Sequence, residues 1–112
     1  LMHLGAVPII GDLKPGNFVH IILNNASHES VGGQPTVAGG VDFEGIAKSC
    51  GYNNYFYADD KNSISSAWNS VKSGVGPVMI EIRIKQGSRP DLGRPTSTPE
   101  LNKMLFMGHV NA

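Results

Sequence analysis

The chain has little cysteine, no net charge and no long hydrophobic run. A single cysteine, Cys50, excludes an internal disulfide and fits a reducing cytoplasm. Nine basic and nine acidic residues cancel, which leaves no electrostatic footprint for nucleic acid or an anionic membrane. No apolar stretch approaches the roughly 20 residues of a membrane span. We therefore expect a cytoplasmic protein that binds neither nucleic acid nor membrane.

Glycine and proline, by contrast, are abundant, with 14 and 7 residues, so loops should be numerous. A length of 112 residues fits one domain with a real core. The chain opens with Leu1-Met2-His3-Leu4-Gly5, which is typical of a helix interior and has no starting cap. This opening predicts a fragment of a longer protein.

The spacing of apolar residues predicts alternating helices and strands. The order of these elements predicts an α/β fold, a three-layer parallel sheet with helices on both faces. Because residues 78–84 alternate between apolar and polar, one face of that strand should be more polar than the other. The expected elements are the end of a helix at 1–10, a turn at 11–17, a strand at 18–23, an irregular loop at 24–40, a helix from Asp42 to Gly51, a strand at 55–58, a helix from Asp60 or Ser63 to Gly74, a strand at 78–84, a loop at 87–98 and a helix from Pro99.

The first expected strand stops at two neighbouring asparagines, Asn24 and Asn25, and a Gly-rich turn follows. In open α/β sheets, ligands bind beyond the carboxyl ends of the strands. Two carboxamides there can offer neutral oxygen ligands to a hard cation, such as Mg²⁺ bound to a diphosphate. Asparagine pairs are also common in turns, and Asn53-Asn54, which precedes a strand, is expected to be one.

The string NNASHESVGGQPT at 24–36 resembles the second half of the thiamine-diphosphate motif, and its full wording resembles the phosphonopyruvate decarboxylase family. Residues 41–48, and 87–96 with Asn102-Lys103, are also similar to this family, so the resemblance covers nearly all of the chain. It implies part of a thiamine-diphosphate-binding fold. It also implies a lyase of phosphonate biosynthesis that converts 3-phosphonopyruvate to phosphonoacetaldehyde and CO₂.

The resemblance implies two cofactors, thiamine diphosphate and Mg²⁺. When the positions of the family's motif are transferred to this sequence, the cofactor-binding residues are Asn24, Asn25, Ala26, Ser27 and His28. Among them, Asn25 would bind Mg²⁺ through its side-chain oxygen and Ser27 through its backbone carbonyl. The third ligand of the family, the aspartate of a Gly-Asp-Gly strand, is expected before Leu1. The string at 11–13 is too close to Asn24 to replace it.

The same resemblance implies partners for this chain. The chain itself, residues 1–112, would be the C-terminal part of a diphosphate- and Mg²⁺-binding domain. The family keeps the glutamate that activates the cofactor in a pyrimidine-binding domain, on the same or a neighbouring subunit, and neither Glu29 nor Glu44 replaces it. That domain and the Gly-Asp-Gly strand are expected to be absent from these residues. We expect a homo-oligomer in the full-length protein and an inactive isolated fragment.

Four side chains are candidates for contact with a small 2-oxoacid substrate. His28 and Glu29 follow the metal-binding residues and could move protons, although a local cap or pair is about as good an interpretation of Glu29. Arg89 and Arg94 could bind a phosphonate bidentately, although a solvated surface or a subunit contact is the somewhat favoured interpretation.

Other functions stay open at this point. The Gly-Gly-Gln-Pro-Thr part of the string is shared with sulfopyruvate decarboxylases and 2-oxoacid:ferredoxin oxidoreductases. Residues 28–30 and the arginine-rich tail favour phosphonopyruvate, but a sulfonate is a tetrahedral oxyanion too. A non-catalytic α/β interaction module is the alternative from another class of protein.

Overall fold

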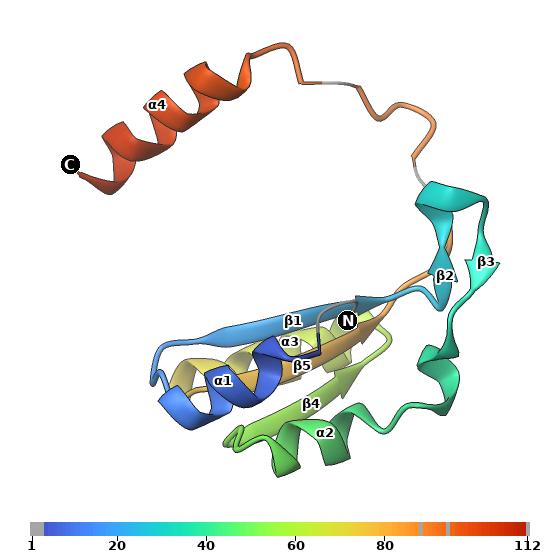
Figure 1. Ribbon diagram of the computed structural model, residues 1–112, viewed down its shortest axis with the longest axis vertical. Helices are drawn as coiled ribbons and strands as arrows, with labels where there is room; N and C mark the ends of the chain where they lie inside the picture. Colours follow the sequence, from blue (N-terminus) through green and yellow to red (C-terminus); the bar gives the residue numbers. More distant parts are fainter. Residues whose placement is uncertain (1–3, 88, 94, 112) are drawn as a thin grey trace.

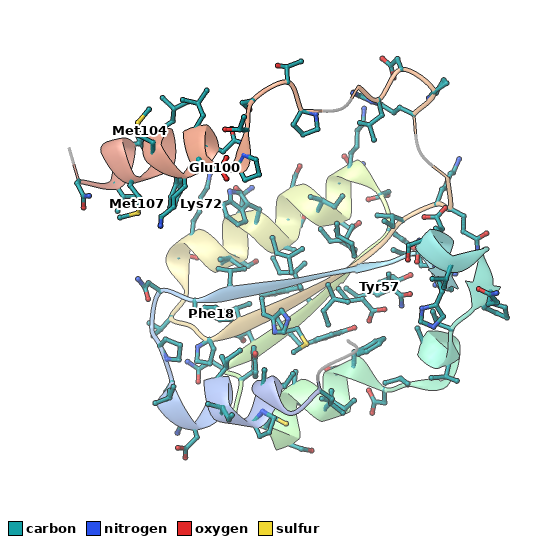
Figure 2. The ribbon with its side chains drawn as sticks, turned by 45° about the horizontal axis from the view of Figure 1, so that its top comes forward. Phe18, Tyr57, Lys72, Glu100, Met104 and Met107 are labelled. Carbon is teal, nitrogen blue, oxygen red and sulfur yellow. The ribbon has the colours of Figure 1, made fainter. Side chains whose placement is uncertain are left out.

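A sheet covered by helices forms the body of the molecule, in a computed structural model that describes residues 4–87, 89–93 and 95–111 (Figure 1). Its three parallel strands lie in the order β1 (Val19–Asn24), β5 (Val78–Arg83) and β4 (Asn54–Ala58). Helices α1 (Ala6–Leu13) and α2 (Phe43–Ser49) cover one face, and α3 (Lys61–Ser73) covers the other (Figure 2). The predicted α/β fold with a three-layer parallel sheet is confirmed.

Two hydrophobic cores hold the layers together, one on each face of the sheet. The core between β5 and α3 contains Ala67, Val78 and Ile80. The larger core joins α1 and α2 to the sheet and is made by Val7, Ile22, Phe43, Ala47, Tyr52 and Met79. Because strand β5 contributes to both cores, it is the buried centre of the sheet.

The burial of β5 corrects one expectation. The alternation at 78–84 predicted a strand with a more polar face, but the first four residues of β5 are all buried, Glu81 among them. The physical reason is position, since β5 has a strand on each side and helices on both faces. A lone glutamate in such a strand is a buried polar group that must find partners.

Helix starts follow local capping chemistry. Asp42 caps α2 by accepting a hydrogen bond from the Gly45 amide at 2.8 Å, as expected. Asp60 rather than Ser63 caps α3, and the two residues form a reciprocal capping box. Thr98 caps helix α4 (Pro99–Val110). This helix lies away from the sheet in Figure 1 and buries none of its side chains.

Helix α1 begins and ends later than expected, since a turn occupies residues 4–5 and the helix starts only at Ala6. It runs through residues 11–13, which were expected to be a turn, and ends at Lys14 in the left-handed conformation. Pro8 is tolerated because it lies in the first turn, where backbone N–H groups have no partner within the helix. Residues 1–3 of the expected helix lie outside the described residues. Gly11 packs on the Cys50 carbonyl at the end of α2, so the two helices approach closely there.

The segment at 24–40 was expected to be irregular, and this expectation is wrong in part. It contains a two-stranded antiparallel ladder and two 3₁₀ turns, because its backbone groups pair locally. These elements are β2 (Ser27–His28), η1 (Glu29–Val31), β3 (Gln34–Pro35) and η2 (Val37–Gly40). Across the described residues, every helix is too short or too polar to cross a membrane.

Candidate functional site

A cavity of about 530 Å³ opens at the carboxyl end of β1. Figure 2 locates this end of the sheet near the labelled Tyr57, with Phe18 at the opposite end. All five residues that the motif assigns to cofactor binding, Asn24 to His28, line the cavity. Side chains from α2, including Phe43 and Ile46, form part of its wall. The structure thus brings the predicted residues together at one cavity, while their binding role stays a prediction.

The turn that begins the cavity wall has an unusual backbone. Ala26 has a φ of 56°, in the left-handed region, which is unfavourable by roughly 1–3 kcal/mol for a residue other than glycine. Three hydrogen bonds of 3.0 Å hold the turn. The Ala26 amide donates to Asn24 Oδ1, the Ser27 amide donates to Asn25 Oδ1, and the Thr36 amide donates to the Ala26 carbonyl. Strained backbone of this kind is found most often at functional sites.

The two predicted metal ligands, Asn25 and Ser27, have oxygens suited to a hard cation. Asn25 Oδ1 accepts one hydrogen bond, from the Ser27 amide, and a carboxamide oxygen has two lone pairs. Ser27 lies opposite Pro35 in the ladder, and proline has no N–H to donate to the Ser27 carbonyl. Neutral carbonyl and carboxamide oxygens are accepted ligands for divalent cations such as Mg²⁺.

The Ser27 hydroxyl is suited to binding a polar ligand in the cavity. The residue is 8% exposed, and its Oγ has no hydrogen-bond partner among the described residues. A buried hydroxyl without a partner is unfavourable by about 1–3 kcal/mol. A diphosphate or a bound cation's water would provide that partner, so the donor set fits the expected cofactor.

A buried glutamate on β5 supports the turn, and sequence reasoning missed it. Glu81 Oε1 accepts a hydrogen bond from Asn24 Nδ2 at 2.6 Å, and Oε2 accepts one from the Tyr55 hydroxyl at 2.5 Å. Burial, followed by this hydrogen bond and the charge of Glu81, raises the pKa of Tyr55 far above its usual range. The available signal was one acidic residue inside the predicted strand at 78–84.

His28 and Glu29 lie at the start of η1, beside the turn. The exposed His28 lines the cavity. Glu29 Oε2 accepts a hydrogen bond from Asn25 Nδ2 at 2.7 Å, and Oε1 accepts one from the Gly87 amide. The local pairing considered for Glu29 is therefore present. A part in proton transfer stays a prediction for both residues.

The two candidate arginines differ in what can be said of them. Arg89 is exposed, and its Nε lies 3.4 Å from Asp91 Oδ1, which is also exposed. Such a surface pair contributes little stability, and this environment agrees with the solvated interpretation of Arg89. Arg94 lies outside the described residues.

Of the second asparagine pair, which was expected to be a turn, only Asn53 lies in the loop before β4. Asn53 Nδ2 donates hydrogen bonds to the carbonyls of Gly76 at 2.7 Å and Val75 at 3.0 Å. Asn54 is the first residue of β4. These contacts join two loops at the amino end of the sheet, far along the strands from the cavity.

The chain is similar to curated proteins that are named decarboxylases. Phosphonopyruvate decarboxylase of Streptomyces viridochromogenes is 37% identical over 99 residues, and that of Streptomyces hygroscopicus is 36% identical over 99 residues. This chain is homologous to one part of the phosphonopyruvate decarboxylases. The resemblance drawn from its motifs is confirmed. An alignment of this length within 112 residues has to include the segment at 24–28, wherever it begins.

The coverage of these matches is unequal. They include 88% of this chain but only 25% of either relative, so the chain spans about a quarter of the length of the phosphonopyruvate decarboxylases that it matches. Sulfopyruvate decarboxylase subunit beta of Methanothermobacter thermautotrophicus is 31% identical over 88 residues, which are 79% of this chain and 45% of that subunit. No family model matches the chain.

Proposed function

We propose that the full-length protein is a decarboxylase, dependent on thiamine diphosphate and Mg²⁺, that converts 3-phosphonopyruvate to phosphonoacetaldehyde and CO₂ in phosphonate biosynthesis. One observation carries the proposal. The five residues that the motif would use line a single cavity at the end of β1, in a chain similar to phosphonopyruvate decarboxylases over 88% of its length.

The residues of the turn would hold the cofactor through its charged end. Asn25 Oδ1 and the Ser27 carbonyl would bind Mg²⁺, which prefers a nearly octahedral set of oxygens. The Ser27 hydroxyl, which lacks a partner among the described residues, would donate to a diphosphate oxygen. The strained backbone at Ala26 would point these groups to one side of the turn.

Thiamine diphosphate, when bound, supplies the carbanion stabilisation that lets a 2-oxoacid lose CO₂. Overall, the bond between the carboxyl and keto carbons breaks, CO₂ leaves, and a proton takes its place on the former keto carbon. We assign the movement of this proton to His28, which lines the cavity. Glu29 is the second candidate, because Asn25 and Gly87 already engage both of its oxygens.

The chain would be the C-terminal part of the diphosphate- and Mg²⁺-binding domain in this enzyme. A Gly-Asp-Gly strand elsewhere in the protein would give the third metal ligand. A pyrimidine-binding domain of the same or a neighbouring subunit would give the activating glutamate, in a cytoplasmic homo-oligomer. The isolated 112-residue chain should then be inactive. Arg89 or Arg94 would contact the phosphonate group.

Sulfopyruvate decarboxylation is a second candidate function. The match to a sulfopyruvate decarboxylase beta subunit at 31% identity over 79% of this chain favours it. The two reactions differ only in the oxyanion that the substrate carries, so the substrate comparison below separates them.

The test is an assay of the purified full-length protein with phosphonopyruvate, sulfopyruvate or pyruvate, measuring release of CO₂ and aldehyde. We expect turnover of phosphonopyruvate only when both thiamine diphosphate and Mg²⁺ are present. Preference for sulfopyruvate would transfer the assignment to the second candidate. A full-length protein that neither binds thiamine diphosphate nor decarboxylates would indicate a non-catalytic module. The isolated chain, assayed in parallel, should show no turnover above background.

A further inference from the structure

We propose that Glu81 is a positioning residue, which orients the Asn24 carboxamide and thereby holds the turn at 25–27 in the shape that a metal-bound diphosphate requires. The inference rests on the proposed function for the ligand. The hold of Glu81 on the turn is itself a property of the protein without ligand. Glu81 has no place in the binding motif, lies on another strand and would touch neither the cofactor nor the substrate.

Glu81 lies buried at the centre of the sheet, directly opposite Ile22 in the register between β5 and β1. A buried carboxylate is unfavourable unless hydrogen bonds replace its hydration. Each oxygen of Glu81 has one such partner, Asn24 Nδ2 for Oε1 and the Tyr55 hydroxyl for Oε2. The group is thus held from both neighbouring strands, which leaves it little freedom to move.

The contact with Glu81 holds the NH₂ end of the Asn24 carboxamide, while the Ala26 amide and Arg83 Nη1 donate to its oxygen end. A carboxylate accepts hydrogen bonds and cannot donate, so the NH₂ end of Asn24 must face Glu81. The oxygen end then faces the Ala26 amide, from which it accepts a hydrogen bond of 3.0 Å. This bond supports the left-handed backbone of Ala26, which lies between the two predicted metal ligands. A rotated carboxamide would present NH₂ to an amide donor and lose the bond.

The chemistry of the site explains why glutamate would be required. Asn24 and Tyr55 both donate, so the residue between them must accept twice. In Glu81→Gln, the Tyr55 hydroxyl can rotate and accept from the new amide, so the oxygen remains for Asn24, as a weaker neutral acceptor. In Glu81→Met, the volume is similar, but no strong acceptor remains. We therefore expect Glu81→Met to disturb the turn and weaken cofactor binding more than Glu81→Gln does.

The experiment uses the full-length protein and two measurements. Hydrogen–deuterium exchange of peptides covering residues 24–28 reports the order of the turn without ligand. Calorimetric titration with thiamine diphosphate in excess Mg²⁺ reports affinity. We expect Glu81→Met to lose protection in the turn and to bind roughly 10–100-fold more weakly, the range for partners that orient metal ligands. Glu81→Gln should show a smaller loss of both.

The matched control is Glu44→Gln. Glu44 lies on the exposed side of α2, where it pairs with Lys48 at 2.6 Å, and it is not among the residues that line the cavity. This variant should keep wild-type protection and affinity. If folded Glu81→Met also kept both, the inference would be overturned. If Glu81→Met failed to fold, the Glu81→Gln comparison would decide, and wild-type values there would overturn the inference equally.

A double-mutant cycle tests whether Glu81 acts through Asn24. If it does, adding Glu81→Met to Asn24→Ala should cause no further loss of affinity, because the group to be oriented is already gone. Losses that add in free energy would contradict the inference and assign Glu81 an independent role. A wild-type protein that binds no thiamine diphosphate would refute the proposed function. The exchange measurement would still test the hold of Glu81 on the turn.

Discussion

The carboxylate of Glu29 accepts a hydrogen bond from the side-chain amide of Asn25, with 2.7 Å between Oε2 and Nδ2. Its other oxygen accepts from the Gly87 amide, in the segment that follows β5. Glu29 thus joins the predicted metal ligand to a distant part of the chain. Because the NH₂ end of Asn25 is held by Glu29, its oxygen end is directed away from Glu29 and remains available to a cation. The geometry favours a positioning role for Glu29 over proton transfer.

We expect Glu29→Gln to raise the cofactor concentration needed for half-maximal activity while leaving kcat near the wild-type value at saturation. The glutamine can accept from Asn25 or from the Gly87 amide but presents a donor to the other. His28→Gln should instead lower kcat, by about 10²-fold or more, the usual contribution of a general acid or base. Steady-state kinetics of the full-length enzyme over a range of cofactor concentrations separates the two effects. The same fall in kcat for Glu29→Gln would return proton transfer to that residue.

Removing the predicted side-chain ligand should weaken metal binding. Asn25→Ala deletes an oxygen from a nearly octahedral Mg²⁺ site, and we expect the affinity for Mg²⁺ and cofactor to fall at least about 10-fold. Titration of the full-length protein with Mg²⁺ at a fixed concentration of thiamine diphosphate measures this change.

The control for that titration has to be chosen from the structure. Asn53→Ala is unsuitable, because the Asn53 side chain donates hydrogen bonds to two backbone carbonyls. Asn69 lies on the exposed surface of α3, so Asn69→Ala should retain wild-type binding. Equal affinities for Asn25→Ala and Asn69→Ala would show that the ligand assignment at the end of β1 is wrong.

The close approach of α1 and α2 predicts a large effect on stability. A Cβ added at Gly11 would lie 1.6 Å from the Cys50 carbonyl oxygen, which requires the helices to separate. We expect Gly11→Ala to destabilise the fold by at least about 1–3 kcal/mol, as in overpacked cores. Gly108 has open space around its Cβ position and lies within α4, so Gly108→Ala should be neutral or stabilising by up to about 1 kcal/mol. Unfolding of the full-length variants in urea would test this order, and equal midpoints would contradict it.

Local chemistry made most of the fold predictable from the sequence. Asp42 and Asp60 cap helices through their own side chains, and the apolar run at 18–23 identifies a strand. The run does not predict burial correctly, because β1 lies at the edge of the sheet and leaves Ile21 and Leu23 exposed. The errors arose where distant residues decide the outcome. Gly11, which was expected to begin a turn, instead lies in α1 against the carbonyl of Cys50, and the burial of β5 depends on the strands and helices around it.

The same distinction between local and distant determinants applies to the candidate site. Asn24 and Asn25 could be found because a strand end followed by carboxamides is a local pattern with a known use. Glu81 could not, since its contact with Asn24 spans 57 positions and depends on the register of two parallel strands. The Ser27 hydroxyl was missed for a similar reason, because only the folded loop removes it from solvent.

Recognition of the phosphonate group can be tested by comparing substrates. If an arginine holds this group, replacement by lysine keeps the charge but loses the bidentate geometry. The loss should fall on phosphonopyruvate and spare pyruvate, and should be about 1.5–3 kcal/mol in kcat/KM. For Arg89→Lys we expect instead the same small change, within about 0.5 kcal/mol, for both substrates, because Arg89 is exposed and pairs with Asp91 on the surface. A selective loss in this variant would assign phosphonate recognition to Arg89 and contradict its solvated interpretation. The same pair of substrates, used with Arg94→Lys, tests the second candidate of the loop, where a selective loss would support its contact with the phosphonate.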